Sequence, residues 1–227
     1  MPKKTKAIKK TDIDAKKPWL KKVGITILEE PSIEPSKTFL IVCEGQTEEL
    51  YFKSFPSNSI TVKCLSLGCS NFQLVNCTID LKNGEDFDEV WVVFDMDFTP
   101  DKGPKQKAAY DNSIRKALDH DIKVAYSNDC FELWFYLHYY FTDQQNLRYF
   151  YYKELSKIWD TNYEKEGKTR AFAKNIFSLL RKDDNASAEK AVVRAESLYE
   201  RQKDLPFHQQ NPISTVFQLF KSLSKSL

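Results

Sequence analysis

Short apolar runs separated by connections of helix length are the feature that most constrains how this chain folds. Residues 38–43 and 89–94 are continuous apolar, β-branched runs bounded by polar residues, which is typical of buried parallel strands. Residues 59–67 and 122–126 predict two further strands. Helical character is predicted for segments 48–55, 71–81, 105–120 and 130–141. Because strands and helices alternate, the pattern predicts an α/β fold with a parallel sheet of about four strands and flanking helices.

Only helices are predicted after residue 147, with candidates at 149–159, 170–181, 186–203 and 214–223. Asn211 to Thr215 has the pattern of a helix entry, with Ser214 or Thr215 near the cap. We therefore expect three parts. They are a basic disordered arm at 1–36, an α/β domain at 37–145, and an α-helical C-terminal extension at 146–227 packed on that domain.

The net charge of +2 conceals an asymmetry along the chain. The first 22 residues carry nine Lys and two Asp, a local charge of +7, which leaves −5 for the rest. A basic arm on a mildly acidic body is typical of proteins that contact polyanions such as nucleic acid. A solubilising tail is the alternative interpretation of the same arm.

Several classes of site and location are excluded by simple counts. The six glycines do not form a dinucleotide fingerprint or a P-loop, so phosphate chemistry here requires metal ions or basic side chains. The five cysteines contain no C-x-x-C pair and the three histidines are far apart, which favours buried free thiols over zinc. Neither a secretory signal nor an apolar run of membrane-spanning length is present. We expect a cytoplasmic protein with no membrane partner.

Acidic residues follow the first and third predicted strands. Glu44 ends the first strand, Asp95 and Asp97 end the third, and Glu48 lies four residues after Glu44. Ligands of open α/β sheets bind beyond the carboxyl ends of the strands, so these four carboxylates are expected to converge there. Clustered carboxylates repel one another, and an all-oxygen set suits Mg²⁺ or Mn²⁺. Two such ions would support phosphodiester cleavage. The alternative is that these acids only cap helices and solvate turns.

Two further candidates lie later in the chain. Glu132 begins an aromatic helix after the fourth strand, where it is either a partner of the helix dipole or a functional group. Lys168 belongs to a basic cluster with Lys165 and Arg170, and such a residue can offset phosphate charge in a transition state. A solvated surface cluster is the alternative. The aromatic residues of segment 131–140 and His138 are expected to pack in the core.

Four motifs follow one another along the chain: Val42-Cys43-Glu44-Gly45-x-Thr47-Glu48, Val93-Phe94-Asp95-x-Asp97, Ser127-Asn128-x-Cys130-Phe131-Glu132-Leu133-Trp134 and Asn211-Pro212-x-Ser214-Thr215. In this order they resemble the RloB-like family, whose Toprim domain is shared with topoisomerases, primases and nucleases of the overcoming-lysogenization-defect type. The resemblance runs from about Phe39 to the C-terminus. The Ser-Asn-x-Cys-Phe-Glu-Leu-Trp block is the specific part.

This resemblance implies a metal-dependent nuclease of the abortive-infection and type I restriction loci that defend bacteria and archaea against phage. It implies that Asp95 and Asp97 are the main metal ligands, that Glu44 is a metal ligand or general acid/base, and that Glu48 is the second acid. An ATPase partner of the ABC or AAA type is also implied. DNA, RNA and tRNA all remain open as substrates.

Two other functions fit parts of the sequence. Asp95-Met96-Asp97-Phe98-Thr99 matches the D-x-D-x-T motif of haloacid-dehalogenase-like phosphatases, with Asp95 as nucleophile and Asp183-Asp184 as a late acidic pair. That motif normally lies on the first strand of its sheet, whereas two strands precede it here. A non-catalytic Toprim module that binds nucleic acid or a partner is the second alternative, although all four acids are present.

Overall fold

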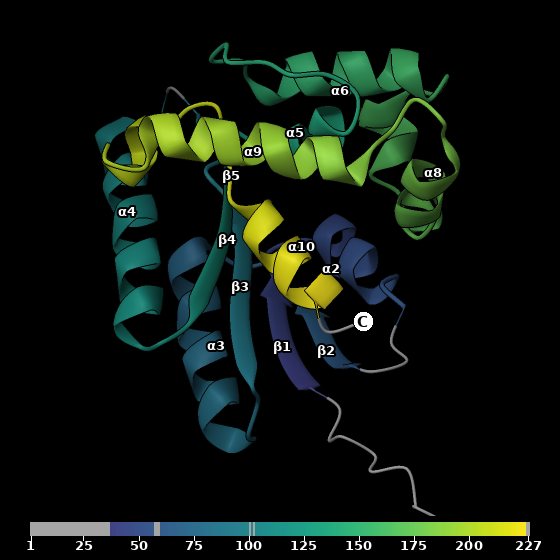
Figure 1. Cartoon of the computed structure of the whole chain (residues 1–227). Helices are drawn as coiled ribbons and strands as arrows, with labels where there is room; N and C mark the ends of the chain where they lie inside the picture. Colours follow the sequence, from purple (N-terminus) through teal and green to yellow (C-terminus); the bar gives the residue numbers. More distant parts are fainter. Residues whose placement is uncertain (1–36, 57–59, 100, 102, 226–227) are drawn as a thin grey trace, which may run out of the picture. The chain divides into compact units, whose positions relative to one another are not determined.

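A five-stranded sheet is the centre of the fold in the computed structural model, which describes residues 37–56, 60–99, 101 and 103–225. The strand order is β2-β1-β3-β4-β5 (Figure 1). The strands are β1 (Lys37–Cys43), β2 (Ile60–Ser66), β3 (Glu89–Asp95), β4 (Lys123–Asn128) and β5 (Ile213–Ser214). The first four are parallel, as predicted, and the short β5 pairs antiparallel with β4. The basic arm expected at 1–36 lies outside the described residues.

Helices cover both faces of the sheet. They are α2 (Gln46–Lys53), α3 (Asn71–Gly84), α4 (Gly103–Asp119), α5 (Glu132–Leu137), α6 (Arg148–Ile158), α7 (Arg170–Ala173), α8 (Ile176–Lys182), α9 (Ala188–Gln202) and α10 (Val216–Lys225). A π-helical turn (Tyr163–Gly167) and a 3₁₀ turn (Phe207–Gln209) complete the description. No helix in the described ranges has the length and apolar character that a bilayer crossing requires.

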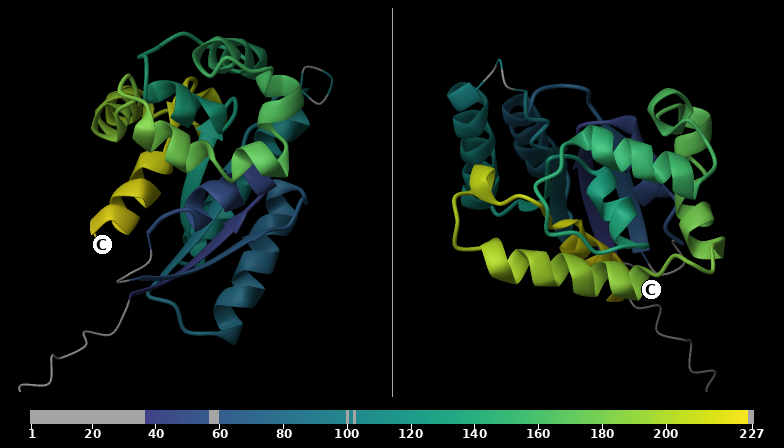
Figure 2. Two further views of the ribbon diagram at one scale, coloured as in Figure 1. Left: turned by 90° about the vertical axis from the view of Figure 1, so that its right-hand side faces the viewer. Right: turned by 90° about the horizontal axis from the view of Figure 1, so that it is seen from above.

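Alternating side chains of the central strands enter two hydrophobic clusters, one on each face of the sheet. Leu40 and Val92 pack with residues of α3 and α4, whereas Ile41 and Val93 pack with residues from α2 and α5 to α10. Figure 2 shows α3 and α10 on opposite sides of the sheet. The second cluster therefore joins residues from both sides of the boundary expected near residue 145. Figure 1 also shows α5, α6 and α9 above the carboxyl ends of the strands.

Two predictions about the later elements are wrong in detail, and a third is confirmed but incomplete. Segment 170–181 forms two helices, α7 and α8, instead of one. The aromatic helix predicted at 130–141 is limited to α5, and its Phe131, Trp134 and Phe135 are buried, as expected. Segment 211–215 does lead into a helix, since α10 begins at Val216 directly after Thr215, but the same segment also forms the short β5 on the edge of β4, which was not predicted.

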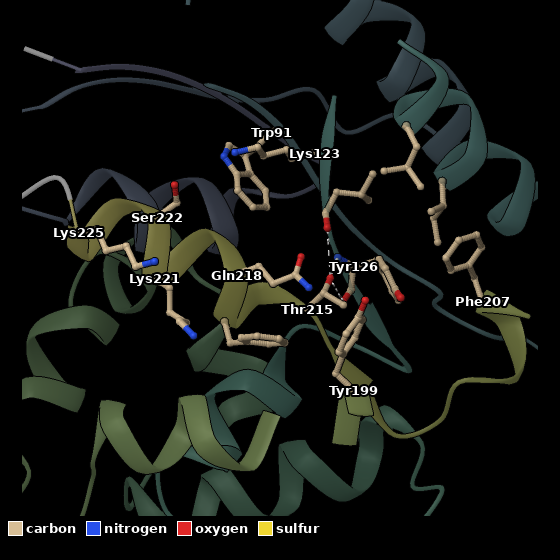
Figure 3. A pocket seen from close by; sticks show the side chains of 14 residues that line it. Trp91, Lys123, Tyr126, Tyr199, Phe207, Thr215, Gln218, Lys221, Ser222 and Lys225 are labelled. Carbon is tan, nitrogen blue, oxygen red and sulfur yellow. Dashed lines mark hydrogen bonds between the residues drawn. The ribbon is translucent and has the colours of Figure 1, made fainter. Parts of the chain in front are cut away.

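Thr215 supplies this edge pairing with its backbone and its hydroxyl group. Its backbone N–H donates to the Tyr126 carbonyl at 2.9 Å, and its Oγ1 accepts from the Tyr126 N–H at 2.8 Å. The same hydroxyl lies 3.2 Å from the carbonyl oxygens of Val124 and Tyr126, to which it can donate (Figure 3). Because Thr215 is buried, water cannot replace these bonds.

We predict that Thr215→Val, which keeps the side-chain shape, lowers the free energy of unfolding by about 1–3 kcal/mol, since it leaves the buried Tyr126 N–H without its acceptor. Urea unfolding followed by circular dichroism measures this change. Thr215→Ser retains the hydroxyl and is the matched control, so it is expected to lose less than the valine variant. Equal stability of the valine variant and the native chain would show that these hydrogen bonds do not hold β5 and α10 to the sheet.

Candidate active site at the carboxyl edge of the sheet

The ends of β1 and β3 bring the first two candidate acids together. The backbone N–H of Glu44 donates to the carbonyl of Val93 at 2.9 Å, which extends the strand pairing by one residue. On the other side, the backbone N–H of Asp95 lies 3.4 Å from Glu44 Oε2. The carboxylate that ends the first strand therefore touches the backbone of the acid that ends the third. This contact confirms the expected convergence of the two strand ends.

Glu48 approaches the same edge from the first turn of α2. The helix begins at Gln46 with Gly45 as its N-cap. A side chain at position 45 would place its Cβ 2.7 Å from Glu48 Oε2, so glycine leaves the space that this carboxylate occupies. Glu48 is buried, and its Oε2 has no hydrogen-bond partner among the described residues.

Only one of the two oxygens of the Asp95 carboxylate has a hydrogen-bond partner among the described residues. Its Oδ2 accepts a 2.8 Å hydrogen bond from the backbone N–H of Phe131, at the start of α5. Its Oδ1 is buried and has no partner within the described part of the chain. Asn71, the first residue of α3, donates from Nδ2 to the Asp95 carbonyl at 3.0 Å. The starts of α3 and α5 thus hold Asp95 in place and leave one oxygen uncompensated.

Glu132 lies in a small polar network with the predicted lysine. Its Oε1 accepts from the hydroxyl of Tyr163 at 3.1 Å and lies 3.5 Å from Lys168 Nζ. Lys168 also donates to the hydroxyl of Tyr152, and its ammonium group lies 4.3 Å from the centre of that ring. Lys168, 45% of whose side chain is exposed, is therefore next to the acidic cluster, and Lys165 of the same basic cluster lies on the π-helical turn.

Asp97 differs from the other acids because a cation already neutralises it. Its side chain is about half exposed, and Oδ1 forms a 2.6 Å ion pair with Nη1 of Arg148. The same guanidinium lies 3.3 Å from Oδ2 of the buried Asp129. Asp97 also has a positive φ of 48°, a conformation that aspartate tolerates better than most residues. The structure thus pairs this predicted metal ligand with Arg148.

Burial and mutual repulsion raise the pKa values of three of these carboxyl groups. Burial, and then the charge of Asp97, raise the pKa of Glu44 to about 7. Burial also raises the pKa of Glu48 to about 7, with further contributions from Glu132 and Glu44. The pKa of Asp95 lies well above its usual value, because of burial and then the charges of Glu48, Asp97, Glu132 and Glu44. The acids therefore behave as one cluster that favours a bound proton or cation.

The donor chemistry of the cluster suits a hard cation, but its geometry is open. The two unpartnered buried oxygens, Glu48 Oε2 and Asp95 Oδ1, are of the type that Mg²⁺ and Mn²⁺ prefer. No three Asp, Glu, His or Cys side chains of the described residues gather closely enough to form a ready-made metal centre. The carboxylates thus fit a cation by chemistry, whereas a closed coordination shell would require side-chain movement or water ligands.

A cavity of about 590 Å³ opens beside the cluster and is lined by Glu44, Asp95, Asp97 and Arg148, together with residues of α3 and α4. A second cavity, of about 540 Å³, lies between β4, α4 and α10. Figure 3 shows its aromatic and basic lining, in which no carboxylate takes part. Only the first of these two cavities therefore adjoins the predicted acids.

Sequence reasoning missed Arg148, Asp129, Asn71 and Tyr163. Arg148 and Asn71 are the first residues of their helices, where charged and polar side chains are common, so their type carried no specific signal. Tyr163 lies 31 residues from the Glu132 that it contacts, and no local pattern predicts that pairing. The Asp183 of the phosphatase alternative follows α8, where it accepts hydrogen bonds from Tyr139 and Asn185 and does not line the acidic cavity.

We predict that Glu48→Gln stabilises the protein in EDTA at pH 8 but not at pH 5. The folded-state pKa of about 7 exceeds the ordinary 4.5, so the folded state binds the Glu48 proton more tightly than the unfolded state. Stability is therefore lost as the pH rises from about 4.5 to about 7, and glutamine avoids that loss. Melting temperatures across this range measure the effect, with Glu164→Gln on the exposed π-helical turn as control. Identical pH profiles for Glu48→Gln and the native chain would contradict it.

Comparisons with known proteins give one match. Searches of curated proteins and of solved structures returned no significant similarity. A family model described as "RloB-like protein" matches residues 39–223, which span the sheet, the acidic cluster, Lys168 and most of α10. The match covers well over half of the chain, and it includes every element that contributes to the site described above. This chain therefore belongs to the RloB-like protein family.

Proposed function

We propose that this chain is a metal-dependent nuclease that cleaves phosphodiester bonds in DNA or RNA. The observation that carries the proposal is the meeting of Glu44, Glu48, Asp95 and Glu132, from four different elements, at the carboxyl edge of the sheet. Two buried oxygens of this cluster lack a partner among the described residues. A fold gains nothing in stability from such an arrangement, so a bound cation is the simplest reason for it.

The residues that would hold metal are Glu44, Glu48, Asp95 and Asp97. One or two Mg²⁺ or Mn²⁺ ions bound there would supply Lewis-acid activation of water and would stabilise charge on the leaving oxygen. Asp97 is the outermost of the four acids and is paired with Arg148, so its participation requires that ion pair to loosen or to be shared. Glu48 and Asp95 have the free oxygens and are the best-placed pair.

Glu44 also fits the alternative role of general acid/base, and the roles of Lys168 and Glu132 follow from their surroundings. The pKa of Glu44, about 7, allows this carboxyl to accept or release a proton near neutral pH, as a general acid/base must. Lys168 keeps its charge, because burial is outweighed by the adjacent Glu132 and Tyr152 and its pKa is raised. A fixed ammonium group beside the acids would offset phosphate charge in the transition state. Glu132 and Tyr163 position this ammonium group.

The resemblance to Toprim nucleases supports the same reaction class and adds a biological context. We propose that the protein acts as an effector of abortive infection against phage, with an ABC- or AAA-type ATPase as its partner. The acidic cluster would act on the phosphodiester bond that DNA, RNA and tRNA share, so all three are offered in the test below.

We predict that Asp95→Asn lowers cleavage of labelled nucleic acid by at least about 100-fold in Mg²⁺ or Mn²⁺, because it removes a buried charge that metal binding requires. Single-stranded DNA, RNA and tRNA are the substrates, with the cognate ATPase added in parallel. Glu164→Gln is the control for a change of one acid elsewhere on the chain.

Other outcomes of the same assay would reject the proposal. Binding of nucleic acid without cleavage in every condition would favour a non-catalytic module. Hydrolysis of a small phosphate ester through an aspartyl-phosphate on Asp95 would favour the phosphatase. Cleavage that survives both EDTA and Asp95→Asn would place the activity outside this cluster.

We predict that Lys168→Ala lowers the kcat for cleavage by about 100-fold and that Lys168→Arg restores part of it, since arginine keeps the positive charge. Lys165→Ala, three residues away on the exposed turn, is the matched control and should cleave normally. Equal losses in the Lys165 and Lys168 variants would indicate general attraction of the substrate to a basic surface instead of a role at the reacting phosphate.

A further inference from the structure

The cavity beside the acids has a second wall that the proposed reaction does not use. Its lining combines Glu44, Asp95 and Asp97 with residues at the starts of α3 and α4. The α3 side includes Ser70, Asn71 and Phe72, and the α4 side includes Lys105, Gln106 and Tyr110. Its volume of about 590 Å³ lies within the range of sites that hold one small organic ligand.

Phe72 is the unusual residue of this second wall. It is a large apolar side chain in the first turn of α3, yet it is 45% exposed and lines the cavity. The ammonium group of Lys116 lies 4.4 Å from the centre of its ring and also donates to Asn76 Oδ1 at 2.5 Å. The ring is thus held by a cation–π contact but not covered, which leaves aromatic surface for a ligand.

The position of Phe72 is tied to the acidic cluster by its neighbour in the chain. Asn71 donates to the Asp95 carbonyl at 3.0 Å, so the first turn of α3 is anchored to the end of β3. Asp95 itself lines the same cavity and presents the buried, unpartnered Oδ1. Phe72 and the unsatisfied carboxylate of Asp95 therefore line one cavity and belong to segments that this hydrogen bond joins.

The cations in the cavity lining suit the phosphate group of a nucleotide. Lys105 is exposed at the rim, and the Arg148 guanidinium lies between Asp97 and Asp129, with only 18% of its side chain exposed. Both cations line the cavity together with the carboxylates and Asp101, and Arg148 is paired with Asp97 there. A ligand with a planar ring at one end and a phosphate at the other complements an aromatic platform, nearby cations and a metal-binding edge.

We propose that this cavity holds one unpaired nucleotide of a single-stranded nucleic acid, with its base stacked on Phe72 and its phosphate facing Lys105 and Arg148. The inference rests on the proposed function and names the substrate of that same site. A base can lie flat on a side chain only when its partner strand does not occupy that face, so duplex substrates are disfavoured. Stacking accepts any base, so the subsite selects strandedness more than sequence.

The test is the affinity of the full-length protein for labelled single-stranded RNA and DNA, measured by fluorescence anisotropy in Ca²⁺ to separate binding from cleavage. Phe72→Ala is expected to weaken single-strand binding about tenfold and to leave duplex binding unchanged. Phe72→Trp should keep the affinity, and its added indole fluorescence should fall on binding. Phe141→Ala removes a ring of similar exposure that lies outside this cavity, and it is expected to bind as the native chain does.

Each outcome decides the proposal. Unchanged single-strand affinity of Phe72→Ala, an equal loss for duplex, or no single-strand binding by the native chain would overturn it. A loss confined to a free nucleoside monophosphate, with oligonucleotide binding intact, would also overturn it. Binding that depends on Phe72 without cleavage in any metal would uphold the subsite and reject the nuclease. Cleavage with a KM that Phe72→Ala leaves unchanged would uphold the nuclease and reject the subsite.

Discussion

Ionised carboxylates cannot lie together in a buried space unless a proton or cation compensates their charge, and the arrangement around the carboxyl edge of the sheet follows from this constraint. Glu44, Glu48 and Asp95 all have raised pKa values, with burial as the largest cause. The protein supplies a backbone N–H from Phe131 to Asp95 and a nearby cation, Lys168, to Glu132. It leaves Glu48 Oε2 and Asp95 Oδ1 without a partner in the described ranges. The site is therefore only partly compensated by its own residues.

The sheet and its helices keep this strained cluster in place. β1 and β3 lie in the middle of the sheet, and their side chains enter the hydrophobic clusters on both faces, so the strand ends that carry Glu44 and Asp95 have little freedom. The helices that follow β4 cover one face and also pass above the carboxyl edge (Figure 1). From them come Arg148, Tyr163 and Lys168. The C-terminal helical part is thus a structural component of the site, since the polar partners of Asp97 and Glu132 belong to it.

Much of the fold was predictable because its signals are local. An apolar run followed by an acid indicates a buried strand and its end, and both β1 and β3 end within a residue of the predicted position. The position of Glu48 on a helix directly after the Gly45 turn was predictable from the same local pattern. β5 was missed because two residues carry no period, and their pairing with Ser127 and Asn128 depends on a segment more than eighty residues away. The division between α7 and α8 was missed for a similar reason, since helical propensity continues across residues 174 and 175.

The sequence by itself determined the alternation of the four parallel strands with their helices, the family, and which acids stand at the ends of strands. Backbone propensity and hydrophobic period act over a few residues, so these properties are written locally. Only the tertiary structure decided which carboxylates remain unsatisfied, that Arg148 neutralises Asp97, and that Phe72 lines the same cavity as the acids. Solvation and hydrogen bonding depend on neighbours brought together by folding, and these neighbours come from segments far apart in the chain. The choice of acids was thus local, whereas their electrostatic state was a property of the whole fold.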